Sequence, residues 1–281
     1  MMNIIRADIY RIVRGKGIYI TLIVLLAVIA LQVIGGANMN AGVNINTIEN
    51  YGMNLDDIGA DDFNAESFNL ADMFQPPTGR EAPFQAMEAT SNILYILLPL
   101  LIFISVADFS SGSARNTLAG GVPRGRYFLS KLILSCIFCA LLLVIYVLFS
   151  IIAATLWSGF GGALDGKYIL DVVKIFLPQL FLCLAGACVG NFFAFLFRSA
   201  AVTGIYIAFL LIPSILILIL SLMSRWFERL FDYELTSSIG SLVQINTMSS
   251  WEIAKTLLVG AVYIILAIAG GFAIFKKAEI K

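Results

Sequence analysis

Cysteines are the most reactive side chains in this chain. Cys136 and Cys139 form a C-x-x-C pair, a spacing used in thiol redox chemistry and in metal binding. The pair lies within a long apolar stretch, and Cys183 and Cys188 lie within another. In such surroundings a thiol behaves as a small apolar group. We therefore interpret the four cysteines as packing residues rather than as a redox or metal site.

A second pattern resembles a phosphate-binding loop. The segment that starts at Gly161 and ends with Gly166 and Lys167 matches most of G-x-x-x-x-G-K-[ST]. However, Tyr168 stands where Ser or Thr is needed, and no strand is expected before the segment. We expect no nucleotide to bind there.

The sequence contains no histidine. This excludes Ser–His–Asp and Cys–His catalysis, histidine zinc motifs and histidine proton relays. We therefore expect neither an enzyme nor a chain that binds a metal or cofactor of its own.

The composition indicates which class of protein this chain belongs to. The chain has 281 residues, of which 60% are hydrophobic and 13% charged, and its mean hydropathy is +0.92. Apolar runs of about 20 residues match the thickness of a bilayer's hydrocarbon core. We predict an all-α, polytopic membrane protein with six transmembrane helices, the second of which is short and contains Pro99. The expected spans are residues 18–37, 91–107, 132–156, 175–197, 200–222 and 257–275.

Positive charge sets the expected orientation. Twelve of the eighteen Lys and Arg residues lie before the first span, in the 108–131 loop, at residue 198 or in the tail. By the positive-inside rule these segments are cytoplasmic, together with both termini, in a bacterial plasma membrane. The zero net charge averages two unlike sides and does not indicate a nucleic-acid partner.

Residues 1–17 are predicted to form an interfacial helix. Ile5, Ile9, Ile12 and Val13 recur at helical spacing, with arginines elsewhere around the helix. A basic flank of the first span is the alternative. A cleavable signal peptide is disfavoured, since the apolar run of the first span is too long and lacks a small-residue cleavage site.

Two hydrophilic segments are expected outside the cell. Residues 38–90 form an extracytoplasmic insertion with nine acidic residues against one arginine, Arg80. Its field could gather cationic substrates, but outer loops also tolerate acids without a function. Residues 223–256 form the other connection, in which Trp226, Phe231 and Tyr233 suggest a helix in the outer interface.

Few polar residues interrupt the spans. Candidates for lining a pathway are Gln32, Gln179, Asn191 and Thr203, although hydrogen bonding between helices explains each equally well. The middle of each span lacks charged residues, which weakens an ion-coupled transport mechanism. The Gly186-x-x-x-Gly190 pattern is expected to allow close helix packing within one subunit, with a dimer seam as the alternative.

The 108–131 segment reads DFSSGSARNTLAGGVPRGRYFLSK. Gly112 can release the chain from the second span, and Ser113 is predicted to cap a short helix over residues 114–119. Gly120 and Gly121 end that helix, and Pro123 precedes a new start. So short a helix is not stable alone and needs a surface to pack on.

This segment resembles the cytoplasmic loop of ATP-binding-cassette type-2 permeases. The shared pattern is an acid, a glycine, Arg-Asn-x-Leu, a glycine, an arginine, an aromatic residue and a lysine. The six-span layout and the N-terminal helix also fit, although only the loop is motif-specific. Asp108 and Pro123 stand where the family commonly has Glu and Ser.

The resemblance implies a permease that works as a homo- or heterodimer with a separate cytoplasmic ATPase, which would carry ATP and magnesium. The 108–131 loop would then be the coupling helix. By resemblance, Asp108 positions this helix, and the coupling residues are Arg115, Asn116, Leu118, Arg124 and Tyr127.

The resemblance favours an exporter of an amphipathic or hydrophobic substrate, with peptides among the candidates. Bacterial exporters of peptide toxins such as phenol-soluble modulins, and lantibiotic-protection permeases, are the most similar subgroups. An ion-coupled transporter or channel without an ATPase, and a non-transporting scaffold or immunity protein, remain alternatives.

Overall fold

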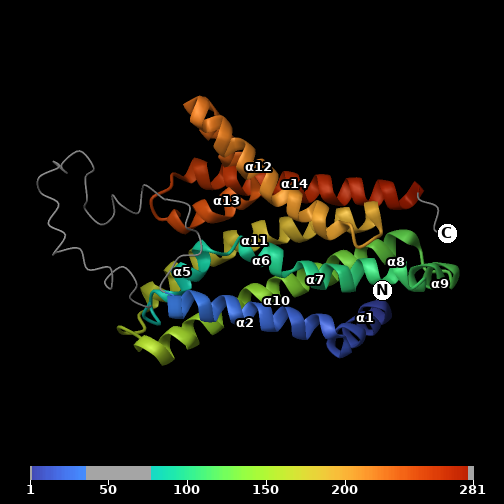
Figure 1. Cartoon of the computed structure of the whole chain (residues 1–281), viewed down its shortest axis with the longest axis horizontal. Helices are drawn as coiled ribbons and strands as arrows, with labels where there is room; N and C mark the ends of the chain where they lie inside the picture. Colours follow the sequence, from blue (N-terminus) through green and yellow to red (C-terminus); the bar gives the residue numbers. More distant parts are fainter. Residues whose placement is uncertain (1, 36–76, 278–281) are drawn as a thin grey trace, which may run out of the picture.

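The computed structural model describes residues 2–35 and 77–277, and the regular elements of these residues are all helical (Figure 1). Most of the acidic 38–90 insertion, up to residue 76, lies outside the described residues. Residues 77–277 belong to the helical bundle.

Within residues 2–35 and 77–277, five helices are long and apolar enough to cross a membrane. They are Asn92–Ser110, α10 (Arg124–Ser158), α11 (Gly166–Phe197), α12 (Val202–Met223) and α14 (Ser250–Lys277). The N-terminal pair, α1 (Met2–Arg14) and α2 (Lys16–Gly35), meets at 63° and raises the number to six if it counts as one span. The predicted all-α, polytopic fold is confirmed.

The second span is not one regular helix. It consists of α6 (Asn92–Ile96), α7 (Leu98–Leu101), a π-helical turn, η1 (Ile102–Val106), and α8 (Ala107–Ser110). Pro99 lies in the first turn of α7, where its missing N–H costs no helical hydrogen bond. The span therefore continues three residues beyond the predicted end at residue 107.

Three helices begin well before their predicted apolar runs. α10 starts at Arg124 rather than at residue 132, α11 at Gly166 rather than 175, and α14 at Ser250 rather than 257. Hydropathy marks where a helix can meet lipid, whereas hydrogen bonding continues through its polar first turns. The charged residues before these spans are thus helical.

Glycines set the closest helix contacts. A Cβ on Gly186 would lie 2.5 Å from Leu94 Cδ2, and one on Gly190 would lie 2.5 Å from Leu101 Cδ1. The G-x-x-x-G face of α11 therefore packs on the second span of the same chain, as expected. Gly260 of α14 approaches α11 equally closely at Leu182.

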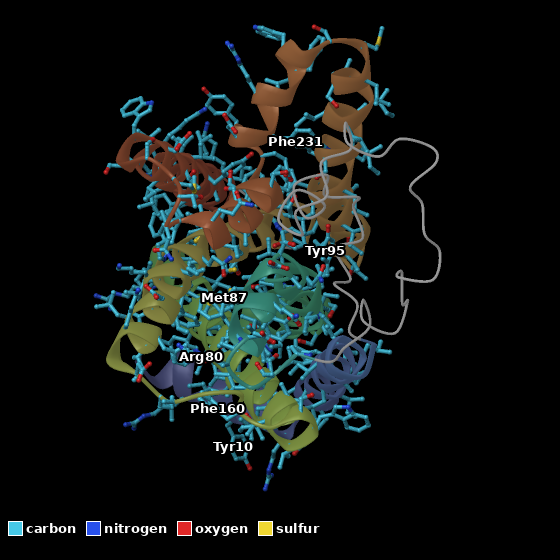
Figure 2. All side chains as sticks on the ribbon, turned by 90° about the vertical axis from the view of Figure 1, so that its left-hand side faces the viewer. Tyr10, Arg80, Met87, Tyr95, Phe160 and Phe231 are labelled. Atoms are coloured by element: carbon cyan, nitrogen blue, oxygen red, sulfur yellow. The ribbon has the colours of Figure 1, made fainter. Side chains whose placement is uncertain are left out.

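The glycine-rich turn after α10 packs against residues 78–80. Gly79 N donates to Gly159 O at 2.9 Å, and Arg80 N donates to Phe160 O at 3.0 Å. The Arg80 guanidinium also lies 5.5 Å from the centre of the Tyr168 ring. Figure 2 shows Arg80 and Phe160 at this end of the bundle, below Met87 of α5 (Ala82–Glu88). The phosphate-loop-like segment thus joins α10 to α11 by packing on its own chain.

The 223–256 connection differs from its prediction. The aromatic segment forms a 3-10 helix, η2 (Arg225–Tyr233), whose Trp226 is 62% exposed. A second helix, α13 (Leu235–Ser241), enters the bundle and buries Leu235 and Ile239. Glu234 caps α13 by accepting from the backbone N–H of Ser237 at 2.6 Å. Sequence reasoning missed α13, because its TSSIGS core looks like a loop.

We expect Gly186→Leu to destabilise the fold. The added side chain would displace the fully buried Leu94, and overpacking of this kind costs about 1–3 kcal/mol. Thermal unfolding in detergent should show a lower midpoint. Gly204→Leu is the matched control, since a Cβ there meets nothing within 4 Å. Equal midpoints for the two variants would contradict the packing argument.

Candidate functional site

The helix α9 (Ser113–Ala119) lies at the same end of the bundle as α1, α8 and the last turn of α14 (Figure 1). Gly112 precedes α9 with a φ of +72°, and Gly121 follows it with a φ of +87°. Both conformations favour glycine. The predicted helix and its glycine ends are therefore confirmed, one residue longer than expected. Ser113 is not its cap, because it occupies the first helical position after Gly112.

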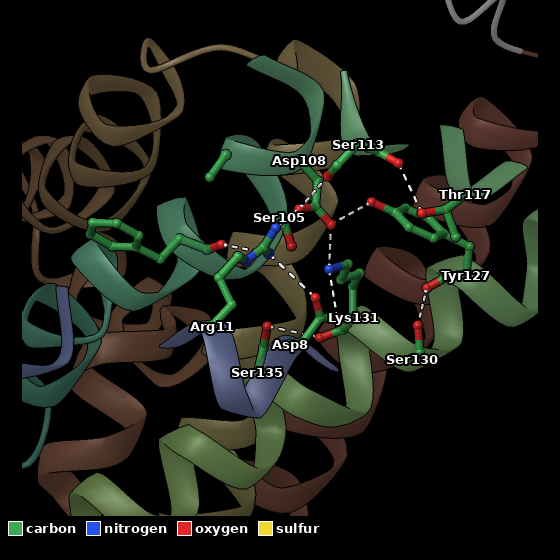
Figure 3. A network of polar contacts seen from close by, with 12 residues as sticks. Asp8, Arg11, Ser105, Asp108, Ser113, Thr117, Tyr127, Ser130, Lys131 and Ser135 are labelled. Carbon is green, nitrogen blue, oxygen red and sulfur yellow. Dashed lines mark hydrogen bonds and ion pairs between the residues drawn. The ribbon is translucent and has the colours of Figure 1, made fainter. Parts of the chain in front are cut away.

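Four charged side chains meet beside α9, and we call them the charge cluster: Asp8, Arg11, Asp108 and Lys131 (Figure 3). The Lys131 ammonium binds Asp8 Oδ2 at 2.7 Å and also contacts Asp108 Oδ2. Arg11 binds Asp108 Oδ1 and lies 3.3 Å from Asp8 Oδ1. The charge cluster thus joins α1, α8 and α10.

The charge cluster is electrically balanced, and three of its four side chains are buried while Arg11 is exposed. Lys131 is 0% exposed, Asp108 3% and Asp8 6%. Two carboxylates face two cations, so no net charge is left in this poorly hydrated place. Burial raises the pKa of the Asp8 carboxyl above its ordinary value, and the Lys131 ammonium acts in the opposite direction. Removing one member would leave a buried charge without its partner.

Asp108 also holds α9. Ser113 Oγ donates to Asp108 Oδ1 at 2.9 Å, and the Tyr127 hydroxyl donates to Asp108 Oδ2 at 2.8 Å. Both Asp108 oxygens are therefore shared among the charge cluster, the first residue of α9 and the second turn of α10 (Figure 3). Hydrogen bonds to a charged acceptor are stronger than neutral ones. Asp108 is the connection between α9 and the bundle.

An aromatic cluster supports this arrangement. The rings of Phe109, Tyr127, Phe195 and Phe275 contact one another, with centroids 4.9 Å apart for Phe195 and Phe275 and 5.4 Å apart for Phe109 and Phe195. These rings come from α8, α10, α11 and α14. Two of the helices that meet at the charge cluster, α8 and α10, are therefore packed together with α11 and α14.

The other residues assigned to coupling occupy different surroundings. Arg115 and Asn116 are exposed on α9, while Leu118 is partly buried against the core. Arg124 Nη1 donates to the backbone carbonyl of Lys276 at 2.7 Å, so it contacts the end of α14. Tyr127 is 1% exposed and cannot present a surface to a partner. Of the five, Arg115, Asn116 and Arg124 are exposed, and Arg124 is tied to α14.

The pathway candidates are not brought together. Gln179 accepts from Thr90 at 3.1 Å and donates to the carbonyls of Met87 and Ile239 at 2.9 and 3.0 Å. It thereby fastens α5 and α13 to α11.

Asn191 accepts from Ser105 Oγ at 3.0 Å and lies twelve residues along α11 from Gln179, roughly 18 Å. Thr203 is partly buried in the first turn of α12. Gln32 belongs to α2, but its side chain lies outside the described residues. Within the described ranges, hydrogen bonding between helices accounts for Gln179 and Asn191. The same ranges contain no group of three Cys, Asp or Glu side chains placed to hold a metal.

Sequence reasoning missed Asp8, Arg11 and Lys131. The buried face of α1 contains Ile5, Asp8 and Ile12, whereas Ile9 and Val13, expected on that face, are 38% and 49% exposed. The available signal for a buried acid was Asp8, which lies between Ile5 and Ile12 on the same face of the helix. Its partner, Lys131, is 123 residues away, and no sequence pattern connects the two.

We expect Lys131→Met to lower the unfolding temperature strongly. The substitution leaves two buried carboxylates facing Arg11 alone, and breaking a buried ion pair costs about 3–5 kcal/mol. Thermal unfolding in detergent measures the effect.

The double variant Asp8→Asn/Lys131→Met restores balance, because Arg11 then faces Asp108 alone. Its midpoint should lie above that of Lys131→Met. A further decrease in the double variant would contradict the charge-balance argument.

Ser113→Ala should loosen α9 without unfolding the bundle. A hydrogen bond to a charged group contributes about 1.5–3 kcal/mol, so amides of residues 113–119 should exchange with solvent about tenfold faster or more. Hydrogen exchange read by mass spectrometry resolves this segment. Ser110→Ala, which removes a bond to the nearby Ala107 carbonyl, should leave the exchange of α9 unchanged.

No protein-family model matches this chain, and no curated protein matches it either.

Proposed function

We propose that this chain is the membrane-spanning permease subunit of an ATP-driven exporter. A separate cytoplasmic ATPase would bind ATP and magnesium and would contact α9. The cargo would be an amphipathic or hydrophobic molecule, with peptides among the candidates. The observation that carries this proposal is the attachment of the exposed helix α9 to the buried charge cluster through Asp108.

The attachment suits the transmission of force. Seven residues of helix at the end of a bundle are not stable by themselves, so their position depends on what holds them. Asp108 holds the first residue of α9, and Lys131 and Arg11 hold Asp108. A partner that moves α9 would therefore pull on α1, α8 and α10 together, a rigid-body rearrangement.

The exposed residues of α9 suit a partner with acidic groups. Arg115 and Asn116 point away from the bundle, next to the positively charged start of α10. The positive-inside rule places this end in the cytoplasm, where ATP is available. The partner contact would then involve Arg115 and Asn116, with Asp108 and Tyr127 as positioning residues within the permease.

The apolar surfaces fit a lipid environment. α12 diverges from the bundle in Figure 1 and exposes large apolar side chains along most of its length, among them Ile212, Leu216 and Ile219. On α1, Tyr10 and Val13 are exposed beside the arginines, as expected for a helix at the inner leaflet. A second copy of the permease, or a related chain, would cover part of this surface.

Arg115→Glu should separate the permease from its ATPase while leaving the fold intact. Like charges at an interface cost several kcal/mol, so ATPase activity isolated with the tagged permease from native membranes should fall about tenfold or more. Lys277→Glu is the matched control, since it reverses an exposed charge at the same end of the bundle outside α9.

Two outcomes would count against the proposal. One is a wild-type permease that carries no ATPase out of native membranes. The other is an Arg115→Glu variant that retains the wild-type activity. Transport driven by an ion gradient in liposomes without nucleotide would instead favour a transporter that works alone.

A further inference from the structure

All four cysteines of the chain come together between α10 and α11. Cys136 Sγ lies 4.0 Å from Cys188 Sγ. One turn farther along α10, Cys139 Sγ donates to the backbone carbonyl of Cys183 at 3.4 Å. The two contacts follow the order expected for neighbouring antiparallel helices. Their gathering is a property of the fold, since the pairs are 52 and 44 residues apart in the sequence.

The two pairs differ in the contact that they make. Cys136 and Cys188 place their sulfur atoms against each other, whereas the Cys139 thiol is directed at a carbonyl oxygen. The two pairs also differ in access. Cys136 is partly exposed, and its neighbour Ile137 is 48% exposed on the outer surface of α10, whereas Cys139 and Cys183 are 0% exposed. An apolar reagent dissolved in the bilayer can therefore reach Cys136.

We propose that Cys136 and Cys188 form a disulfide when a two-electron oxidant of the quinone class reaches them from the bilayer. Both S–H bonds break and one S–S bond forms. The two electrons and two protons pass to the quinone, which leaves as the quinol. The reverse reaction needs a thiol reductant, which regenerates both thiols. This modification is independent of the function proposed above.

The geometry favours this pair. A disulfide has a sulfur–sulfur distance of about 2.05 Å, so the two atoms must approach by roughly 2 Å from their separation of 4.0 Å. The bond would fix α10 to α11 and close a loop that contains the 159–165 turn. It would replace a packing contact between the two spans by a covalent bond.

A cleavable chain tests the disulfide directly. A protease recognition sequence is inserted between Ala163 and Leu164, both exposed in the turn between the two helices. The full-length protein in liposomes is treated with tetramethylbenzoquinone, whose substituted ring leaves no position for thiol addition, and is then cut. On a denaturing gel without reductant the two fragments should migrate together as one full-length band. Reductant should separate them completely.

Cysteine variants identify the two residues that form the disulfide. Cys188→Ala and Cys136→Ala should each yield separated fragments, whereas the double variant Cys139→Ala/Cys183→Ala should still yield the joined band. Separate fragments from the oxidised wild type would overturn the proposal and leave the thiols as packing groups. A joined band that persists in Cys188→Ala would overturn the assignment to this pair.

Discussion

The charges of Asp8, Asp108 and Lys131 share one buried volume at the end of this bundle, and the exposed Arg11 binds both carboxylates at its edge. A single charge in such surroundings would cost several kcal/mol, so the members of the charge cluster keep their places by holding one another. Because Asp8 and Arg11 come from α1, Asp108 from α8 and Lys131 from α10, the same constraint fixes three elements at one point. The orientation of α9 follows from Asp108, which also accepts from Ser113.

At the opposite end of the bundle, neutral hydrogen bonds act beside ion pairs such as Lys255–Asp232. Gln179 uses both ends of its amide to join α5 and α13 to α11. Between the two ends, Gly186 and Gly190 let α11 approach the second span closely enough for direct packing. Neutral hydrogen bonds of this kind are weaker than charge-assisted ones. The ion pairs of Lys131 at the end with α9 are buried, whereas the Lys255–Asp232 pair is partly exposed.

This difference bears on how movement could pass through the proposed permease. A force on α9 would act on an end where three elements are fastened together. In the proposed permease these three elements would therefore move as a unit during a rigid-body transition.

Several features of the site could be predicted from the sequence. Gly112 and Gly121 marked both ends of α9 because glycine is the residue that tolerates the backbone angles found there. The apolar runs marked the spans, since their length must match a bilayer. Asp108 was assigned a positioning role by resemblance; it accepts a hydrogen bond from Ser113 of α9, and the role itself stays a prediction. By contrast, Arg124 contacts α14, and Tyr127 is buried.

The sequence by itself determined the helical class, the approximate spans and the place of α9, because each depends on the local order of apolar residues and glycines. Only the tertiary structure decided that Lys131 is buried against Asp8, that α13 enters the bundle, and that Cys136 meets Cys188. These contacts join residues that are far apart along the chain. Their energies depend on burial and distance, which appear only after the helices have packed.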